Sequence, residues 1–570
     1  MLFSFCSLNS YANNKYGVLA YHSVVDDTNK NGKNYYYPQT ISAQHLIQHF
    51  NWLKENGFHV ISWQQVLDAE NGKTALPDNA VLLSFDDGYE TMYSVVYPLL
   101  KAYNYSAVFA PVASWINTKG EIQYGNEKLP RSTMTTWEHI KEMRDSGLVE
   151  IASHSYNQHF GHKANPAGSS LPAIISPEYK NGKYETKAHY TQRLERDFAQ
   201  SAQDIKKATG IAPNIMVWPY GQYNDTAIKA AEKAGMSHHF SLKSERLNHI
   251  GTRHVGRLLI DAETSFDTLK EYLTGTLYES NLTRAVHIKL DDLYSSDPAQ
   301  FNRNFDALIS RIYHLGVNVV YLQAYADDNH DNIADALYFP NSYLPMKSDL
   351  FSRVAWQLFN RTGVKVYAEM PINAINLPNK DKFTALKSIY NDLSFYAKFN
   401  GILFNDPTSP TSQEDLSHLV NMSEDLKNAI APYAMHGSEY LLSAYALNIT
   451  EQTHLVQSIT TLKPHFNQVL LQISPYSQPN TEASKQLSHL LNTLKENKQI
   501  ALNKVVFDFS TINEQTKQPI ATQELINWIK LLEENHIYSF GYSSDNFIQN
   551  NPNIKEIKPY ISANPDALKK

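Results

Sequence analysis

Short apolar runs alternate with amphipathic stretches through the first half of the chain. The runs with strand character are YGVLAYHSV from Tyr16, AVLLSFDDG from Ala80, SAVFAPV from Ser106, LVEIASHS from Leu148 and IMVWPYG from Ile215. Between them, stretches such as 43–55 and 191–209 place apolar residues at helical spacing. This alternation predicts parallel strands joined by right-handed helical crossovers.

A second series of apolar runs begins near residue 284. It comprises RAVHIKL from Arg284, VNVVYLQAY from Val317, VKVYAEMPI from Val364, GILFND from Gly401, SAYAL from Ser443, NQVLLQISP from Asn467, KVVFDFS from Lys504 and YSFGYSSD from Tyr538. Eight strands with room for a helix between neighbours predict a (β/α) barrel. We place the domain boundary near residue 275, after a helix expected around 266–277, which gives domains 13–275 and 276–570.

Composition narrows the class of protein. A chain of 570 residues is too long for one core, and 42% hydrophobic with 19% charged residues is typical of globular domains. The net charge of −7 gives no basic surface for nucleic acid, so no nucleic-acid partner is expected. It suits a neutral or weakly cationic ligand. Some of the 36 tyrosines can stack on sugar rings, although most of them are expected to fill cores.

The first residues predict export. Residues 1–12 run apolar and then small and polar, and Ser10 and Ala12 have the spacing of a signal-peptidase site. The segment has no basic start and a short apolar part, so we interpret it as a truncated secretory signal. Cys6 is the only cysteine, which excludes an intramolecular disulfide. Lipid anchoring at Cys6 stays open, although Phe3 and Phe5 do not fit the usual motif.

Two carboxylates follow the apolar strand that begins at Ala80. Asp86 and Asp87 precede Gly88, where the chain is expected to turn, so both side chains can reach one cleft. An isolated Asp-Asp-Gly most often forms a solvated turn. The motif therefore gains meaning only beside other strand-end groups.

Two histidines follow the strand that begins at Leu148. His154 and His159 are five residues apart, which would leave roughly 140° between them on a helix. On a strand end and the turn after it, both imidazoles can face one metal ion, with a carboxylate as third ligand. A lone histidine here would more often be structural. The nearby His162 is read as a surface residue.

Two further motifs lie at strand ends. Pro219 and Gly221, on either side of Tyr220, fix a tight backbone that can aim an N–H group at a developing oxyanion. His22 follows Tyr21 at the end of the first run and carries little information alone.

Together the Phe-Asp-Asp strand end, the His-Ser-x-x-x-His segment and the Pro-Tyr motif resemble the polysaccharide deacetylase (NodB-homology) family. The chain is most similar to its periplasmic members that deacetylate poly-β-1,6-N-acetylglucosamine for biofilm export. There the catalytic domain is circularly permuted, and a histidine lies near its start in a context like Tyr21-His22. The similarity continues through DPAQFNRNFDALISRI from Asp297, LYFPNSYLPM from Leu337, DLFSRVAWQL from Asp349 and GYSSDNF from Gly541.

The resemblance implies one divalent metal ion held by Asp87, His154 and His159. One carboxylate and two imidazoles suit Zn, Co, Ni or Fe, so the metal's identity stays open.

The resemblance also implies a role for the neighbouring groups. Asp86 is expected to be the general base and His22 the general acid, while the backbone at Pro219 and Tyr220 completes the oxyanion site. These roles agree with chemistry, because coordination would occupy a base's lone pairs and imidazole ordinarily titrates near neutral pH.

The family's second domain resembles a glycoside hydrolase barrel that binds, and in some members cleaves, the partly deacetylated polymer. This chain departs from that pattern at strand ends, where barrel enzymes keep their sites. The departures are Asn405 and Pro407 around Asp406, Lys289 before Asp291, Glu369 for Trp, and Ser474 for Met. Since glycosidases need two suitable carboxyl groups or a substrate group standing in for one, we favour polymer binding through Asp291 and Asp406 over hydrolysis.

The expected fold is α/β, with a deformed, circularly permuted deacetylase barrel followed by a glycoside-hydrolase-like TIM barrel. The expected function is hydrolysis of the N-acetyl amide of a glucosamine polymer in the periplasm, in association with the outer membrane and a polysaccharide exporter. Two alternatives stay open: a deacetylase of chitin or peptidoglycan, and a non-catalytic polysaccharide-binding scaffold.

Overall fold

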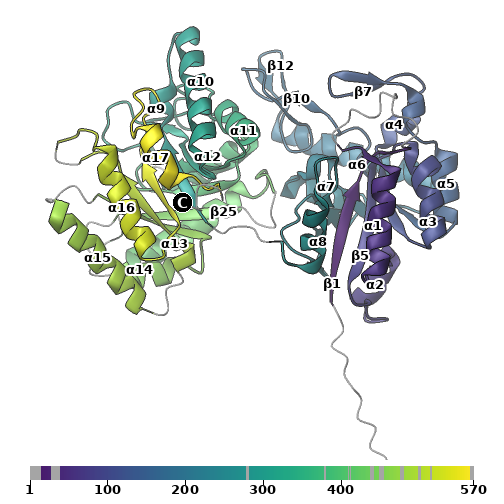
Figure 1. Cartoon of the computed structure of the whole chain (residues 1–570). Coiled ribbons are helices and arrows are strands. Elements are labelled where there is room, and N and C mark those ends of the chain that lie inside the picture. The colour runs from purple at the N-terminus through teal and green to yellow at the C-terminus, as the bar shows by residue number, and fades with distance from the viewer. Residues whose placement is uncertain are drawn as a thin grey trace, which may run out of the picture.

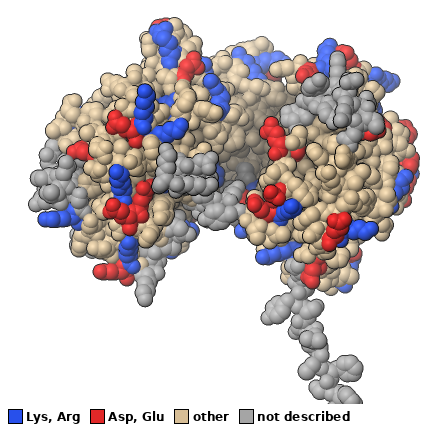
Figure 2. All heavy atoms as spheres, viewed as in Figure 1, with Lys and Arg blue, Asp and Glu red and all other residues tan. Residues whose placement is uncertain are grey.

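The computed structural model describes residues 14–26, 39–277, 282–377, 381–408, 410, 412–436, 442–448, 455–474, 480–497, 502–513 and 516–564. The expected signal segment 1–12, with Cys6, lies outside the described residues. Two lobes lie side by side, and the surface in Figure 2 is hollowed between them, with acidic and basic side chains interspersed on the displayed face (Figures 1 and 2). Among the described helices, none is long and apolar enough to cross a membrane.

The first lobe is built on a sheet of seven strands. These are β1 (Lys15–Tyr21), β4 (His59–Ile61), β5 (Ala80–Asp87), β6 (Ala107–Pro111), β9 (Val149–Ile151), β16 (Asn248–His249) and β18 (Leu258–Leu259). All of them pair in parallel except β16, which is antiparallel to β1. The strand β5 is buried at every position, as expected for a central parallel strand.

A second sheet nearly completes a ring with the first. It contains the parallel strands β14 (Ile215–Val217), β15 (His238–Phe240) and β17 (His254–Val255). A bridge between Ser153 and Met216 joins its β14 edge to the strand end after β9. At the other edge the chain bends at Gly256 and Arg257 into β18, which pairs with β1. The ring is interrupted, as expected for a deformed barrel.

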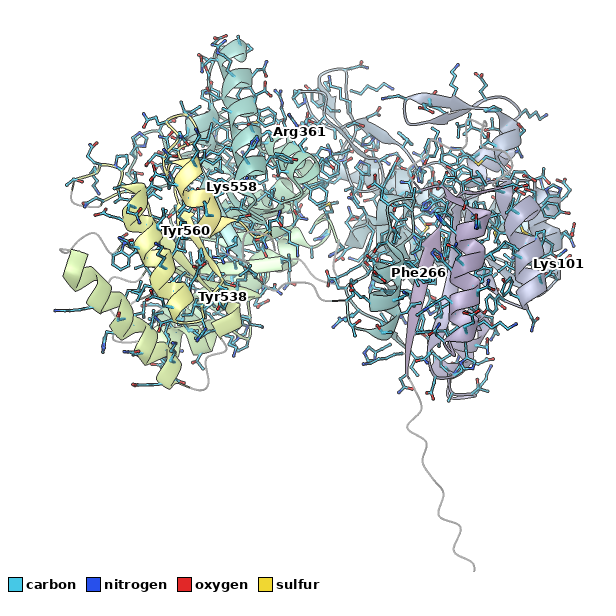
Figure 3. The ribbon with its side chains drawn as sticks, in the orientation of Figure 1. Lys101, Phe266, Arg361, Tyr538, Lys558 and Tyr560 are labelled. Carbon is cyan, nitrogen blue, oxygen red and sulfur yellow. The ribbon has the colours of Figure 1, made fainter. Side chains whose placement is uncertain are left out.

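Helices cover the outside of this ring (Figure 1). They include α1 (Ala43–Glu55), α2 (Trp63–Glu70), α3 (Tyr97–Tyr103), α4 (Ala113–Asn117), α5 (Trp137–Asp145), α6 (Lys187–Thr209), α7 (Asp225–Lys233) and α8 (Phe266–Thr274). The predicted helix 43–55 is confirmed, whereas α6 begins four residues before the predicted 191. The reason is Thr186, whose side chain accepts the His189 N–H and caps the earlier start. Phe266, labelled in Figure 3, opens α8. Its ring stacks on that of His49 of α1, with the ring centroids 5.5 Å apart.

The second lobe is a closed parallel barrel, and all eight predicted strands are confirmed. They are β19 (Arg284–Ile288), β20 (Val319–Gln323), β23 (Lys365–Met370), β24 (Gly401–Phe404), β25 (Leu442–Asn448), β26 (Gln468–Ile473), β27 (Val505–Ser510) and β28 (Phe540–Ser543). The outer helices include α10 (Pro298–Leu315), α11 (Phe351–Thr362), α12 (Lys382–Tyr396), α13 (Gln413–Ile430), α14 (Leu455–Leu462), α15 (Asn480–Glu496), α16 (Thr522–Glu534) and α17 (Ile554–Ile561).

The two lobes share an apolar cluster and several polar contacts. Buried residues of the first lobe, among them Tyr190 of α6, pack with Trp356, Phe395 and Met435 of the second. At the start of α6, the Lys187 ammonium lies 2.6 Å from the Asp392 carboxylate. Shared apolar burial of this kind resists separation of the lobes.

Candidate active site

The end of β5 presents two buried carboxylates. Asp87 has φ 73° and Gly88 has φ 102°, so the chain leaves the strand through two left-handed residues. This turn explains how adjacent side chains that would point to opposite faces of a strand serve one site. Asp86 is 2% exposed and Asp87 is fully buried.

His154 follows β9 with a fixed ring orientation. Its Nδ1 lies 2.8 Å from the Val217 carbonyl oxygen, which only accepts, so Nδ1 must carry the proton. The lone pair of Nε2 is then free to face Asp87 Oδ1, 3.3 Å away. A ring held by a carbonyl behind it is the usual arrangement of a histidine metal ligand.

His159 approaches the same carboxylate oxygen from the other end of the loop. Its Nε2 lies 3.3 Å from Asp87 Oδ1, and burial lowers the pKa of its ring to about 4. Aromatic rings surround it, with centroids at 5.1 Å for Trp115, 6.1 Å for Tyr124 and 4.6 Å for Tyr220. Sequence reasoning missed Trp115 and Tyr124, because nothing local distinguishes them from core aromatics.

The residues Asp87, His154 and His159 fit a metal ion. Their ligand atoms all lie within 4.8 Å of one another. Both Asp87 oxygens are buried, and among the described residues neither has a hydrogen-bond partner. Burial raises the pKa of Asp87, but the adjacent histidines outweigh it and hold that pKa below its usual range. A buried, ionised carboxylate without a partner is costly, so this site calls for a cation. His162 is not part of it: it is half-buried, not at the surface as predicted, with Nε2 3.1 Å from the Ser176 carbonyl oxygen.

Asp86 faces a cation that belongs to the protein. The fully buried Arg257 places its guanidinium 2.9 Å from Asp86 Oδ1. Burial raises the pKa of Asp86, and Arg257 together with nearby His154 and His22 more than offsets this, so its pKa is lowered. Arg257 was not found from sequence, since a single arginine between two short strands carries no signal.

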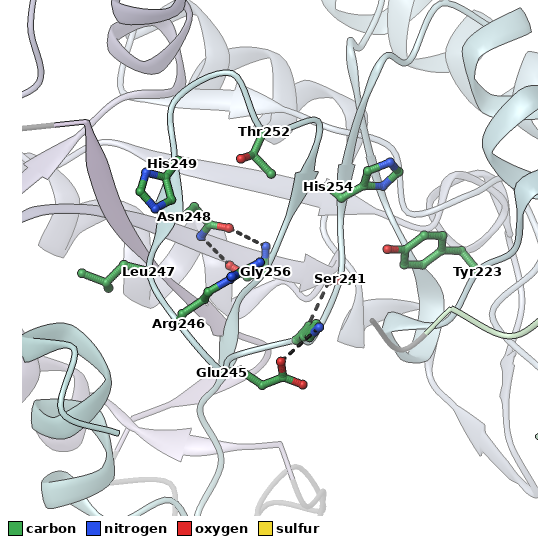
Figure 4. Close-up of a pocket in the computed structure, with 11 residues that line it drawn as sticks. Tyr223, Ser241, Glu245, Arg246, Leu247, Asn248, His249, Thr252, His254 and Gly256 are labelled. Carbon is green, nitrogen blue, oxygen red and sulfur yellow. Dashed lines mark hydrogen bonds and ion pairs between the residues drawn. The ribbon is translucent and has the colours of Figure 1, made fainter. Parts of the chain in front are cut away.

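Hydrogen bonds within the surrounding loop hold Arg257 in place. Its Nε donates to the Ser241 carbonyl at 3.0 Å, and Asn248 bonds both the N–H and the carbonyl of Gly256. A Cβ on Gly256 would lie 2.1 Å from the Lys243 carbonyl oxygen, so only glycine fits there. Figure 4 shows the Asn248–Gly256 pair in the wall of a small cavity. The cavity has a volume of about 50 Å³, and its lining residues do not include the proposed metal ligands.

His22 stands at the end of β1, half-buried. Among the described residues its buried Nδ1 has no hydrogen-bond partner. Tyr21, the residue before it, pairs with Phe85 of β5 in the parallel ladder, so His22 and Asp86 leave neighbouring strands at the same edge of the sheet. The structure therefore brings His22 to the same strand-end site.

Pro219 and Tyr220 form a tight turn after β14. Pro219 is buried, while Tyr220 has φ 59° and a side chain that is 43% exposed. Holding a tyrosine in this left-handed conformation costs roughly 1 kcal/mol or more. Burial and the Asp87 charge raise the pKa of Tyr220 to about 12, so its hydroxyl stays protonated.

The two barrel carboxylates singled out from sequence already have partners in the protein. Asp406 Oδ1 accepts the N–H groups of residues 372, 373 and 374 at 3.1, 2.9 and 2.9 Å. Asp291 accepts from the Tyr338 hydroxyl at 2.6 Å and from the Lys347 ammonium at 3.0 Å. Both residues lie beyond barrel strands, on the expected face.

A histidine between two acids fills the same end of the barrel. His287 Nδ1 lies 2.8 Å from Glu369 Oε2, and its Nε2 lies 3.1 Å from Asp508 Oδ2. Burial lowers the pKa of His287, but the two carboxylates more than reverse this and raise it to about 10. Glu369, one of the departures from the family pattern, is thus one of the two acids in an internal cluster with His287.

Comparisons with known proteins agree with this architecture. A polysaccharide deacetylase model matches residues 73–239, and a model for hypothetical glycosyl hydrolase family 13 matches 287–387 and 416–543. The poly-β-1,6-N-acetyl-D-glucosamine N-deacetylase of Escherichia coli K12 is 30% identical, over 97% of this chain and 92% of its own.

Two solved structures each cover about half of the chain. A de-N-acetylase from Aggregatibacter actinomycetemcomitans is 61% identical, covering 45% of this chain and 99% of its own with a TM-score of 0.44. The glycoside hydrolase domain of PgaB (BpsB) from Bordetella bronchiseptica is 24% identical, covering 50% and 99% with a TM-score of 0.44. An N-deacetylase hydrolyses an amide carbon–nitrogen bond. With a relative this similar along nearly its whole length, the chain belongs to the poly-β-1,6-N-acetyl-D-glucosamine N-deacetylases of the polysaccharide deacetylase family.

Proposed function

We propose that this protein removes acetyl groups from poly-β-1,6-N-acetyl-D-glucosamine, with one divalent metal ion held by Asp87, His154 and His159. The observation that carries the proposal is the buried Asp87 carboxylate, which faces two imidazole nitrogens and has no hydrogen-bond donor among the described residues. The E. coli relative that aligns along the chain is named for this activity.

The chemistry divides between the two acids of the strand end. A divalent ion at this position supplies Lewis-acid chemistry, polarising a substrate carbonyl and lowering the pKa of water from 15.7 to about 7. Asp86 accepts the proton of the attacking water through its carboxylate, which Arg257 keeps ionised and in place. Asp87 is less suited to that task when it serves as a ligand, because a bound cation lowers the basicity of its carboxylate.

Departure of the amine requires a proton. We assign its donation to His22, whose half-buried ring follows β1 at the sheet edge where β5 ends in Asp86 and Asp87. The left-handed turn at Tyr220 shapes the wall next to His159 and positions backbone beside the reacting carbonyl. The ring of Tyr220, 43% exposed, offers the polymer an aromatic face at the mouth.

An acetate-release assay on β-1,6-linked N-acetylglucosamine oligomers tests the proposal. The metal-loaded full chain is expected to release acetate from these oligomers and to lose that activity on chelation. A chitin oligomer and a peptidoglycan fragment serve as competing substrates. Faster release from either would reassign the substrate, and no release from any loaded preparation would leave polysaccharide binding as the function.

We extend the proposal to the barrel, which would bind the partly deacetylated product. Deacetylated sugars carry ammonium groups, and Lys347 shows where one fits, since its own ammonium lies 3.0 Å from Asp291. At the end of another barrel strand, Asp406 Oδ1 accepts three backbone N–H groups. Product held there would be handed to an outer-membrane exporter from a periplasmic location.

Titration of the full chain separates product binding from substrate binding. The Asp86→Asn variant, in which turnover should be strongly reduced, is titrated with acetylated and with partly deacetylated oligomers. Tighter binding of the partly deacetylated oligomer supports the proposal. Equal affinity for both would contradict it, and chain cleavage would show that the barrel is also a hydrolase.

A further inference from the structure

The two histidine ligands are joined by a short loop, in which the Ser155 hydroxyl oxygen accepts the Gln158 N–H at 3.0 Å. Ser155, the residue after His154, has φ 71°, and the loop continues through residues 156–158 to His159. A non-glycine residue in this conformation persists only where its surroundings hold it. The spacing of the two imidazoles therefore depends on the groups that hydrogen-bond to this loop.

The Asp197 carboxylate of helix α6 accepts three hydrogen bonds from this loop. Asp197 Oδ1 accepts the Tyr156 N–H at 2.8 Å, and its Oδ2 accepts the Asn157 N–H at 2.8 Å and the Gln158 side-chain amide at 3.0 Å. Asp197 is only 8% exposed. Three consecutive residues between the two metal ligands thus converge on a single buried side chain.

Neighbouring residues on the same face of α6 also hydrogen-bond to this segment. One turn earlier, Arg193 donates to the Gln158 side-chain oxygen at 2.6 Å. One turn later, the Ser201 hydroxyl lies 2.7 Å from that of Ser153, the residue before His154. The helix therefore holds the segment before, between and beside the ligands.

We infer that Asp197 is a positioning residue for the metal centre, which sets the separation and orientation of His154 and His159 without touching the ion. The inference rests on the proposed metal-dependent function. Its physical reason is that a carboxylate can accept all three donors, whereas an amide presents one oxygen and turns an N–H₂ group toward a backbone N–H. Groups that orient metal ligands typically change metal affinity 10-fold to 100-fold when they are replaced.

Cobalt binding to the metal-free full chain tests this without relying on turnover. Asp197→Asn is expected to weaken Co²⁺ binding by about 10-fold or more and to alter the visible absorption spectrum of the Co²⁺ complex. Asp204→Asn is the matched control, since Asp204 lies on the same helix and accepts from Asn117 and Gln200 instead of the loop. That control should bind Co²⁺ with the affinity and spectrum of the wild type.

The outcomes separate the inference from the proposed function. Wild-type affinity and spectrum in a folded Asp197→Asn variant would overturn the positioning role while leaving the metal site intact. Failure of the wild-type chain itself to bind Co²⁺ would overturn the proposed function. If Asp197→Asn does not fold, Asp197→Glu keeps the buried charge but displaces it, and an unchanged spectrum there would equally refute the inference.

Discussion

The two lobes gather carboxylates and imidazoles at the same ends of parallel strands but leave them in opposite states. In the first lobe, Asp87 is buried without a hydrogen bond among the described residues and faces two histidine nitrogens. In the barrel, Asp406 is held by three N–H groups, and His287 lies between two acids. The contrast teaches that a buried strand-end acid without a hydrogen-bond donor indicates a metal site, whereas an acid already held by donors does not indicate one.

Removing a ligand from the unsatisfied site should have the largest effect. His154→Ala is predicted to abolish metal retention and acetate release together, because two remaining ligands hold a divalent ion poorly. Metal content and acetate release are measured on the same preparation. His162→Ala is the control and should retain both, since His162 lies against Ser176. Full acetate release after thorough chelation would show that Asp87, His154 and His159 do not form a catalytic metal site.

Next in size is the loss of proton transfer at an intact metal site. Asp86→Asn is predicted to retain the metal and to lower turnover by about 10²-fold or more, because the amide cannot accept a proton. His22→Ala should likewise retain the metal and lower turnover, because the leaving amine then lacks its proton donor. Turnover and metal content are determined in parallel. Loss of the metal in either variant would mean that its residue is a ligand.

In the barrel, the acid–histidine–acid cluster should affect stability. His287→Gln leaves two buried carboxylates without their cation and is predicted to destabilise the protein by about 3 kcal/mol or more near pH 6. The pKa of His287 is raised to about 10 when folded, so its stabilisation is complete below about 6.5 and is lost as the pH rises through 10. Melting temperatures of variant and wild type should therefore converge between pH 6 and pH 10.

The exposed His314 on α10 provides the control for that measurement. His314→Gln should melt with the wild type at every pH. A constant gap between His287→Gln and the wild type across the range would show that His287 is not held as an imidazolium.

The smallest expected effect concerns the satisfied acids. Asp406→Asn should weaken binding of a partly deacetylated oligomer by about 10-fold, the value of one hydrogen bond to a charged group, with acetate release unchanged on short substrates. The titration is done in the full chain carrying Asp86→Asn. Unchanged affinity would mean that Asp406 serves only the turn at residues 372–374.

The sequence predicted which residues follow strands. Because parallel strands bring their C-terminal ends to one edge of a sheet, these residues could be expected to lie together. That rule indicated that the acids after one strand and the histidines after another could meet, and the family resemblance implied the set Asp87, His154 and His159. It could not find Arg257 or Asp197, since each acts across more than 35 residues of sequence on a single partner segment. Nor could it show that Asp406 is occupied, because its donors belong to a turn whose shape no local pattern specifies.

The apolar cluster shared by the lobes has a consequence for polymer length. Because Tyr190 and its neighbours pack with Phe395 and Met435, a polymer bound to the barrel is tethered to the same body as the metal site. Its free sugars then meet that site at an effective concentration set by the span between lobes, not by the bulk solution. Oligomers long enough to reach both lobes should gain apparent affinity steeply, whereas shorter ones should behave as independent ligands.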